Sequence, residues 1–382
     1  MVARFDPTAV PSPCFVIDRG ILRNNLCVLA DIRRRCGIRV LFAQKAFATP
    51  ALYGQMAAVL DGVCASGLYE ARLGRERFGG IVHTYSPAFR DDEIDDIVRL
   101  SDHVVFNSEG QLRLFENRVR SLRPAVEIGL RVNPECSVTD TPLYDPCAPG
   151  SRLGVTASRM TGISADAIDG LHVHALCEKD SFALEKVLSA FETKFHPFID
   201  AAKWVNLGGG HAFTRGDYDI DHFVSLMAGF RKRHPDVDVF IEPGAAVVWN
   251  AGVLVTEVLD TISGHPDIAI LDASCACHTP DVLEMPYRPR IRSEVPLAKA
   301  AHVYRLGGVS CLAGDVFGDY GFEQPLARGD RLVFEDMAQY SIVKTTMFNG
   351  VRHPAIAVFD PQDGTCLVLR EFSFDDYLHR QG

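Results

Sequence analysis

No stretch of this chain is hydrophobic for long enough to cross a lipid bilayer, which takes about 20 consecutive apolar residues. The first residues, MVARFDPTAVPSPC, also lack the basic segment followed by an apolar one that marks a secretory signal. From these two absences we expect a cytoplasmic protein that does not associate with a membrane.

The chain also lacks any CxxC pair, although 11 cysteines are scattered between Cys14 and Cys366. An odd number of cysteines without paired spacing argues against a disulfide framework and against a four-cysteine zinc site. We expect most of these thiols to be reduced and buried as small hydrophobic side chains.

Positive charge is scarce as well, because 39 Lys and Arg residues face 49 Asp and Glu residues, for a formal net charge of −10. General nucleic-acid binding requires the opposite balance, so we exclude it. An acidic protein suits a small cationic substrate.

Over its first two thirds, the chain of 382 residues alternates between strand-like and helix-like segments. We predict eight short strands: one ending at Lys45, followed by Gly62–Ser66, Ile81–Ser86, His103–Asn107, Val126–Asn133, Leu171–Leu176, Trp204–Leu207 and Val237–Glu242. Eight strands alternating with helices are typical of a (β/α)8 barrel, whose chemistry lies at the C-terminal ends of the strands. The predicted fold class is therefore α/β, with the barrel at residues 26–255.

Beyond residue 255 the strands follow one another without long helices. The runs are GVLVTEVLDTI, DIAILDAS, HVYRLGGVSC, DRLVFEDM, AIAVFD and CLVLREF. We predict a second, all-β domain from residues 256–382 together with residues 1–25, whose strand Pro13–Asp18 joins the same sheet.

Lys45 ends the first predicted barrel strand. A lysine at the end of a buried strand loses hydration, which lowers its pKa and frees the amine for Schiff-base chemistry. The alternative is a lysine that only caps the strand at the surface.

Gly208-Gly209-Gly210 follows the seventh strand and removes three side chains in succession, so that backbone N–H groups can bind an anion such as phosphate. An ordinary glycine-rich turn is the alternative.

Glu242 ends the eighth strand, where Pro243 and Gly244 turn the chain and leave the carboxylate directed into the barrel mouth. A carboxylate there requires a cationic partner. A protonated pyridine nitrogen would serve and would remain charged as an electron sink. An ion pair with Arg131 is the alternative.

His172 and His174 lie two residues apart on one strand and therefore face the same side of the sheet. One imidazole could stack on a planar cofactor ring. Two alternatives remain, a metal site and two histidines that merely belong to the core, and no third ligand at suitable spacing supports a metal.

In the β-domain, glycines flank Cys311 and Asp315, which indicates an exposed loop carrying a thiol and a carboxylate. A tight turn with a buried cysteine is the alternative. Cys275-Ala276-Cys277-His278 has a C-x-C-H pattern that zinc can use, but further ligands cannot be assigned.

Taken together, these motifs resemble the fold-type III decarboxylases of basic amino acids, which use pyridoxal 5'-phosphate (PLP). Within that family the chain is most similar to the carboxynorspermidine and carboxyspermidine decarboxylases. The likeness spans nearly the whole chain and rests on FAQKAFATP, GLYEARLG, HALCE, LGGGH, DASCACHTPDVLEMPYRP, GGVSCLAGDVFGDY and FEDMAQYSIVKTTMFNG.

The resemblance implies a role for each matching residue. Lys45 would bind the cofactor covalently, His174 would stack on its ring and Glu242 would pair with its pyridine nitrogen. The phosphate would be held by Gly208, Gly209, Gly210 and Tyr340. Cys311 would be the catalytic acid and would come from the partner subunit of a homodimer with shared active sites.

Two positions depart from the family pattern. Ornithine decarboxylase relatives carry arginine directly after EPG to hold the phosphate, whereas this chain has Ala245. Ornithine and diaminopimelate decarboxylases place an acidic residue after the catalytic cysteine, and here it is Leu312. A longer substrate, with its amines near Asp315 first and Glu284 second, fits better.

The resemblance implies decarboxylation of carboxynorspermidine or carboxyspermidine to norspermidine or spermidine, a step of polyamine biosynthesis. Four alternatives stay open: a decarboxylase of diaminopimelate, ornithine or arginine, a racemase, a non-catalytic regulator with a PLP-enzyme fold, and a metal-dependent barrel hydrolase using the histidine pair and Cys277-His278.

Overall fold

The computed structural model describes residues 5–382, so the beginning of the N-terminal segment discussed above, residues 1–4, lies outside it. The chain separates into two compact units: Asn25–Val247, and the described residues up to Asn24 together with Val248–Gly382. Within residues 5–382, none of the helices combines the length and the apolar character that a membrane crossing requires.

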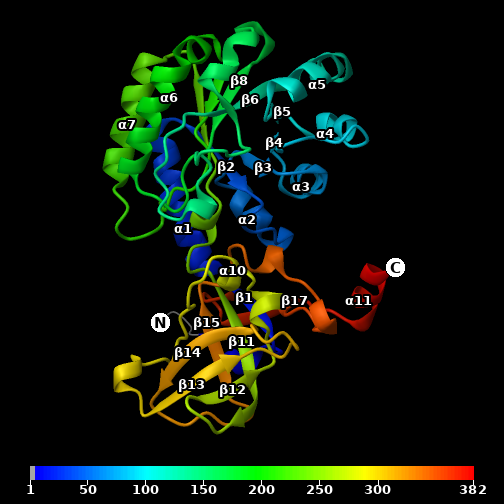
Figure 1. The fold of residues 1–382 in the computed structure, drawn as a ribbon, viewed down its shortest axis with the longest axis vertical. Helices are drawn as coiled ribbons and strands as arrows, with labels where there is room; N and C mark the ends of the chain where they lie inside the picture. The colour runs from blue at the N-terminus through cyan, green and yellow to red at the C-terminus, as the bar shows by residue number, and fades with distance from the viewer. Residues whose placement is uncertain (1–4) are drawn as a thin grey trace. The chain divides into compact units, whose positions relative to one another are not determined.

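The first unit is a closed barrel of parallel strands (Figure 1). Strand β10 pairs with β2, for example Ile241 with Val40, and β5 pairs with β6, for example Val105 with Gly129, which closes the ring. This confirms the predicted barrel. Its strands are β2 (Arg39–Ala43), β3 (Gly62–Ala65), β4 (Ile81–Tyr85), β5 (His103–Phe106), β6 (Glu127–Asn133), β8 (Gly170–Val173), β9 (Trp204–Asn206) and β10 (Asp238–Ile241), with the short β7 (Val155–Thr156) beside β6.

Helices lie outside the barrel strands, as Figure 1 shows for α6 and α7. They are α1 (Arg19–Cys36), α2 (Tyr53–Ala57), α3 (Leu68–Leu73), α4 (Ile94–Leu100), α5 (Glu109–Leu122), α6 (Ser181–Ala201), α7 (Ile220–Arg233) and α8 (Ala245–Val248). The side chains of Ser108, Asp180 and Asp219 accept a backbone N–H at the start of α5, α6 and α7. These caps fix where each helix begins.

Trp204, at the start of β9, fills the barrel interior and is 2% exposed. Space for the indole exists because β6 and β8 carry Gly129 and Gly170 beside it. A Cβ at Gly170 would lie 2.1 Å from Trp204 Cδ2, and one at Gly129 would lie 2.5 Å from Cη2. The interior is therefore a packed core below the mouth.

The second unit is built on a mixed sheet with the strand order β14-β13-β12-β11-β1-β16-β17, and β15 also pairs with β11. The N-terminal strand β1 lies between β11 and β16, so the Pro13–Asp18 prediction is confirmed. The strands are β1 (Cys14–Asp18), β11 (Gly252–Ile262), β12 (Asp267–Leu271), β13 (His302–Gly307), β14 (Val316–Phe322), β15 (Arg331–Glu335), β16 (Ala355–Asp360) and β17 (Thr365–Arg370); the helices are α9 (Cys275–His278), α10 (Asp281–Glu284) and α11 (Phe374–Gln381).

The sequence did not predict β14. Its residues VFGDYGF include Gly318, Asp319 and Gly321, which have low strand propensity. The segment is nevertheless a strand because it pairs along its length with β13, from His302 opposite Phe322 onward. Tertiary pairing overrides local propensity here.

The predicted barrel, residues 26–255, extends past the end of the first unit at Val247. The difference arises because β11 begins at Gly252 and pairs with β1 and β15 of the second unit. Its first residues therefore belong with the sheet.

Candidate active site

Four of the predicted site features lie at the C-terminal ends of neighbouring barrel strands. In barrel order these strands are β2, β10, β9 and β8. Lys45 follows β2, Glu242 follows β10, the run Gly208–Gly210 follows β9 and His174 follows β8. Sequence positions that span nearly 200 residues therefore share one mouth, as expected for a parallel barrel.

Lys45 reaches solvent at this mouth. Protein nevertheless surrounds the amine closely enough that lost hydration lowers the pKa of Lys45; Glu242 opposes this shift and Arg131 adds to it. A lowered pKa makes more of the neutral, nucleophilic amine available near neutral pH.

The Glu242 side chain is buried, at 7% exposure, and is held by polar neighbours. Asn206 Nδ2 donates to its Oε1 across 2.6 Å. His172 Nε2 lies 3.5 Å from Oε2, close enough for electrostatic attraction. Burial by itself raises the pKa of the Glu242 carboxyl, but the neighbouring imidazoles, first that of His172, outweigh burial and lower it well below its usual range. The group is a buried carboxylate.

His174 has a fixed ring orientation. Its Nδ1 accepts the Gly209 N–H at 2.9 Å, so the ring proton of the neutral form lies on Nε2. Burial, with Lys45 and Arg131 nearby, lowers the pKa of His174 well below its usual range. The ring is therefore neutral and flat, suited to stacking.

The glycine run positions side chains as well as offering backbone donors. Gly208 and Gly210 have positive φ angles of 72° and 83°, which favour glycine. The Gly208 N–H donates to Asn206 Oδ1 at 2.8 Å, and the Gly209 N–H donates to His174. Of the three predicted phosphate donors, two are thus already hydrogen-bonded, whereas the Gly210 N–H has no acceptor among residues 5–382.

Arg131 does not pair with Glu242 in the way the sequence allowed. Its guanidinium donates to the backbone oxygen of His174 at 3.1 Å and lies over the Tyr85 ring, 4.6 Å from the ring centroid. Arg131 thereby supports the segment that carries His174.

The sheet unit holds the predicted Cys311. The thiol belongs to an exposed residue whose N–H donates to Asn349 Oδ1 at 2.9 Å. Below it Asp315 is 3% exposed and accepts from Ser310 N, Ser310 Oγ and Ala276 N, at 3.0, 2.6 and 3.0 Å. Asp315 thus holds the loop that presents Cys311.

Glu284 and Tyr340 also lie in the sheet unit. Glu284 is exposed and pairs with Lys344, which also donates to Asp281 at 2.6 Å. The carboxylate is therefore partly neutralised within its own unit. Tyr340 follows β15 with a positive φ of 54°, an uncommon conformation for a residue other than glycine.

The side chains of the two histidine motifs that suggested a metal have other neighbours in the structure. His278 Nδ1 accepts from Ser274 N at 3.1 Å and its Nε2 faces Arg352 O at 3.0 Å, so both ring nitrogens are used by the backbone. His83, His172 and Glu242 offer ligand atoms within 4.8 Å of one another, but Asn206 Nδ2 lies 3.2 Å from His83 Nε2 and uses its lone pair.

Sequence reasoning missed His83 and Asn206. Each is a polar residue within a largely buried barrel strand, and both side chains are completely enclosed. This was the available signal, because buried polar side chains require partners. What the sequence could not supply was the pairing across 123 positions.

The comparisons with known proteins agree with this site. The pyridoxal-dependent decarboxylase, C-terminal sheet domain family model matches residues 14–338. The chain is 44% identical to a carboxyaminopropylagmatine decarboxylase of Synechocystis sp. (98% of this chain, 96% of the relative) and 40% identical to a carboxynorspermidine/carboxyspermidine decarboxylase of Campylobacter jejuni (97% and 98%). A crystal structure of carboxynorspermidine decarboxylase complexed with norspermidine, from C. jejuni, matches with a TM-score of 0.89 and 39% identity over 97% of this chain and all of that one.

The residues at the barrel mouth fit PLP. Its aldehyde requires a neutral lysine amine, its pyridine nitrogen an enclosed carboxylate, and its ring a flat neighbour. Lys45, Glu242 and His174 have these properties and follow β2, β10 and β8 at the same end of the barrel. The chain belongs to the pyridoxal-dependent decarboxylase family, and its cofactor is pyridoxal 5'-phosphate.

Proposed function

We propose that this enzyme decarboxylates carboxynorspermidine and carboxyspermidine, releasing norspermidine and spermidine. The observation that carries the proposal is the likeness to the C. jejuni enzymes along nearly the full length of both chains, in sequence and in fold. The decarboxylase substrate is a small amino acid, and the acidic net charge of −10 suits the cationic tail of these two compounds.

When bound, PLP supplies an electron sink for the pair released as the α-carboxylate leaves as carbon dioxide. The protein prepares that chemistry. Lys45 offers its amine for the covalent attachment and for release of the product. Glu242 holds the pyridine nitrogen protonated, and the neutral ring of His174 supports the cofactor plane.

For the phosphate, Gly210 and Tyr340 are the proposed donors. Gly208 and Gly209 contribute by holding Asn206 and His174 at the same turn. Ala245 has no group that could replace the arginine of ornithine decarboxylase relatives. In this proposal the part played by that arginine falls to the Gly210 N–H and the Tyr340 hydroxyl.

Cys311 is the proposed acid that returns a proton to the α-carbon after carbon dioxide leaves. Its exposed position on a loop held by Asp315 and Asn349 supports this role. We also propose a homodimer in which Cys311 of one subunit completes the site of the other, and action in the cytoplasm, which the free thiols of the described cysteines support.

The distal amines of the substrate need acidic partners. Glu284 remains a proposed contact because it is exposed, with Lys344 as its present partner. For Asp315 the proposed substrate contact has less support, since its two oxygens already accept from Ser310 and Ala276.

A second substrate has a specific observation in its favour. The Synechocystis relative is 44% identical over 98% of this chain and is a carboxyaminopropylagmatine decarboxylase. That compound has the same aminopropyl amino acid end but carries a guanidinium group at its tail. The two candidates therefore differ in tail recognition and share the chemistry at the barrel mouth.

The deciding experiment is a competition assay. Purified holoenzyme is given equimolar carboxynorspermidine, carboxyspermidine and carboxyaminopropylagmatine, and the three product amines are quantified together. We expect both polyamine products to exceed the guanidino product by at least tenfold in kcat/KM. A reversed ratio would replace the proposed substrate. If the enzyme instead turned over only diaminopimelate, ornithine or arginine in parallel assays, the substrate class would be overturned.

A further inference from the structure

A continuous line of polar side chains, buried except at its outer end, runs from Glu242 at the barrel mouth toward the opposite end of the barrel. Asn206 Nδ2 lies 2.6 Å from Glu242 Oε1 and 3.2 Å from His83 Nε2. His83 Nδ1 lies 3.1 Å from His103 Nδ1, and His103 Nε2 lies 3.5 Å from Glu127 Oε2. We call Asn206, His83, His103 and Glu127 the relay.

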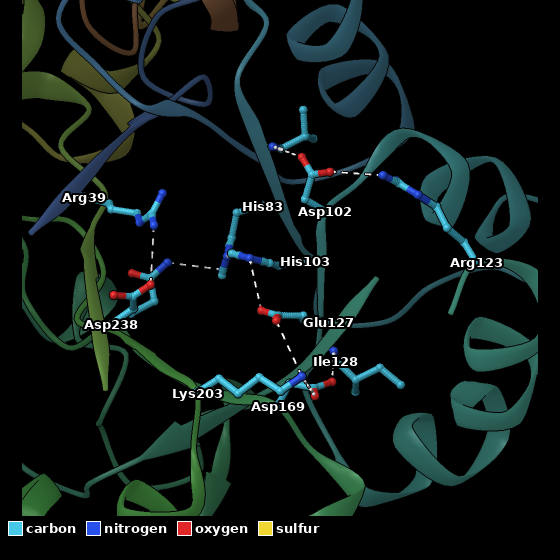
Figure 2. A network of polar contacts seen from close by, with 12 residues as sticks. Arg39, His83, Asp102, His103, Arg123, Glu127, Ile128, Asp169, Lys203 and Asp238 are labelled. Carbon is cyan, nitrogen blue, oxygen red and sulfur yellow. Dashed lines mark hydrogen bonds and ion pairs between the residues drawn. The ribbon is translucent and has the colours of Figure 1, made fainter. Parts of the chain in front are cut away.

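Figure 2 shows the outer half of the relay, where His83, His103 and Glu127 lead to Lys203 and Asp169. Lys203 Nζ lies 3.6 Å from Glu127 Oε1 and 2.8 Å from Asp169 Oδ1. The lysine is exposed, and Glu127 and His103 are the first residues of β6 and β5. The relay therefore connects the N-terminal, solvent-facing end of the barrel with the cofactor end.

Hydrogen-bond accounting fixes the orientation of Asn206. Its Oδ1 must accept, because the partner is the Gly208 N–H at 2.8 Å. Its Nδ2 then donates to both Glu242 and His83. A flipped amide would place oxygen against the Glu242 carboxylate and nitrogen against an N–H, so a single orientation satisfies all three partners.

The same accounting fixes the tautomers of both histidines. His83 Nε2 accepts from Asn206, so the His83 proton lies on Nδ1 and is donated to His103 Nδ1. His103 consequently carries its proton on Nε2, which faces Glu127. Each donor in the line depends on the next one outward.

The surroundings keep these rings neutral and in place. His83 faces His103, His172, Asn206 and Glu242, and it has no solvent exposure. His103 stacks on Trp204 with ring centroids 4.9 Å apart and 18° between planes, and the His83 ring meets the same indole edge-on. Burial lowers the pKa of His83 well below its usual range and that of His103 to about 4.

We propose that His83, His103 and Glu127 are positioning residues that hold the Asn206 amide toward Glu242, and so keep this carboxylate aimed at the cofactor pyridine nitrogen and ionised. None of the three touches the reacting atoms. A proton on His83 Nε2 would confront the Asn206 amide with a second donor and turn it away from Glu242. The inference rests on the proposed role of Glu242 toward the cofactor, but not on the identity of the substrate.

The first test reads the tautomers directly. Protein labelled with nitrogen-15 in histidine is measured by NMR with and without PLP, and the signals are assigned by loss in His83→Leu and His103→Phe. We expect His83 protonated at Nδ1 and His103 at Nε2 at pH 7 in both forms. Protonation of His83 at Nε2 in either form would overturn the proposal.

The second test reads the cofactor. His83→Leu removes the acceptor for Asn206, whereas His83→Gln restores one with its side-chain oxygen. We expect His83→Leu to lower kcat by about 10- to 100-fold, the range typical of partners that orient a ligand, with KM changed less than about threefold, and to shrink the visible absorption band of the lysine-bound cofactor at fixed pH. His83→Gln should recover most of both losses.

His234→Gln is the matched control, because His234 is also buried in the barrel unit and pairs with Asp200 and Glu192 at 3.1 Å. It should change neither the band nor kcat. Equal effects of His83→Leu and His234→Gln would reduce the role of His83 to general stability and overturn the proposal.

Should His83→Leu fail to fold, Glu127→Ala tests the same relay from its half-exposed end. It should mix the two His103 tautomers in the NMR spectrum and reduce the visible band. Unchanged tautomers and an unchanged band would overturn the proposal, and so would one equivalent of tightly bound zinc that His83→Gln removes. If the proposed substrate is wrong, the histidine tautomers and the visible band should still behave as expected here.

Discussion

The side-chain amide of Asn206 joins the two halves of the proposed cofactor site, donating to Glu242 across 2.6 Å while it accepts from Gly208 across 2.8 Å. The first contact serves the residue proposed for the pyridine nitrogen, and the second fixes the turn proposed for the phosphate. One neutral side chain therefore holds together the two residues proposed for the two ends of the cofactor.

Replacing Asn206 with Asp separates these two contacts. An aspartate still accepts from Gly208, but it places a second carboxylate against Glu242, which raises the pKa of both groups. We expect the variant to lose about 1–3 kcal/mol of unfolding free energy and most of its visible cofactor band. Asn133→Asp is the control, because Asn133 also ends a barrel strand and donates to Pro146 and Leu153. It should lose stability and keep the band.

Lys45→Ala should abolish the visible band of bound cofactor and all turnover, since the neutral amine that forms the covalent link is gone. Lys179→Ala is the control at the same end of the barrel, where Lys179 forms an ion pair with Asp140. A Lys45→Ala protein that is still yellow after dialysis and still releases carbon dioxide would assign the cofactor to another lysine.

Cys311→Ala should retain the band but slow product formation. The variant lacks the proposed proton donor for the step that follows loss of carbon dioxide. The measurement is product analysis by mass spectrometry alongside carbon dioxide release. Release of carbon dioxide at the normal rate with the normal amine as the sole product would exclude the protonating role. Cys366→Ala, at another cysteine of the same unit, serves as the control.

Gly170→Ala tests how Trp204 is accommodated. The new methyl group would lie 2.1 Å from the indole, so either the ring or β8 must shift, at a cost of about 1–3 kcal/mol in unfolding free energy. Gly54→Ala is the contrasting variant, because a Cβ at this helical position meets nothing within 4 Å. It should be neutral or gain up to about 1 kcal/mol.

His103 makes stability depend on pH. Burial lowers its pKa from 6.5 to about 4, so between these values the unfolded chain binds more protons and stability rises with pH. At 1.36 kcal/mol for each pKa unit, acidification from pH 7 to below pH 4 costs about 3 kcal/mol at this group. His103→Phe, which keeps the ring on Trp204, should flatten the stability curve between pH 4 and 6.5. Equal slopes for both proteins in urea titrations would contradict this.

The sequence was informative wherever local pattern decides structure. The eight barrel strands were found because their buried residues form short apolar runs. Lys45, His174 and Glu242 could be placed at one end of the barrel because the C-terminal ends of its strands share one face. Nothing local could reveal that His83 meets Asn206, which lies 123 positions away. Strand β14 was missed for the same reason, since pairing with β13 stabilises it against its glycines.

Asp315 shows how far the sequence can predict the role of a site residue. Its spacing from Cys311 indicated a functional loop, but a carboxylate near a thiol can contact a substrate or hold the loop. The positions of Ser310 and Ala276, which donate to its two oxygens, favour loop support. The side chain's role is set by partners that the chain brings in from α9 and the loop itself.

A shared active site would make two inactive variants rescue one another. If Lys45 of one subunit works with Cys311 of the other, a dimer of one Lys45→Ala chain and one Cys311→Ala chain contains one doubly damaged site and one intact site. Random pairing of equal amounts makes half of the dimers mixed, so roughly a quarter of the sites should be intact. Co-expressed variants with different affinity tags should thus show about a quarter of wild-type turnover. Turnover no greater than the mean of the two variants alone would place both residues of each site in a single chain.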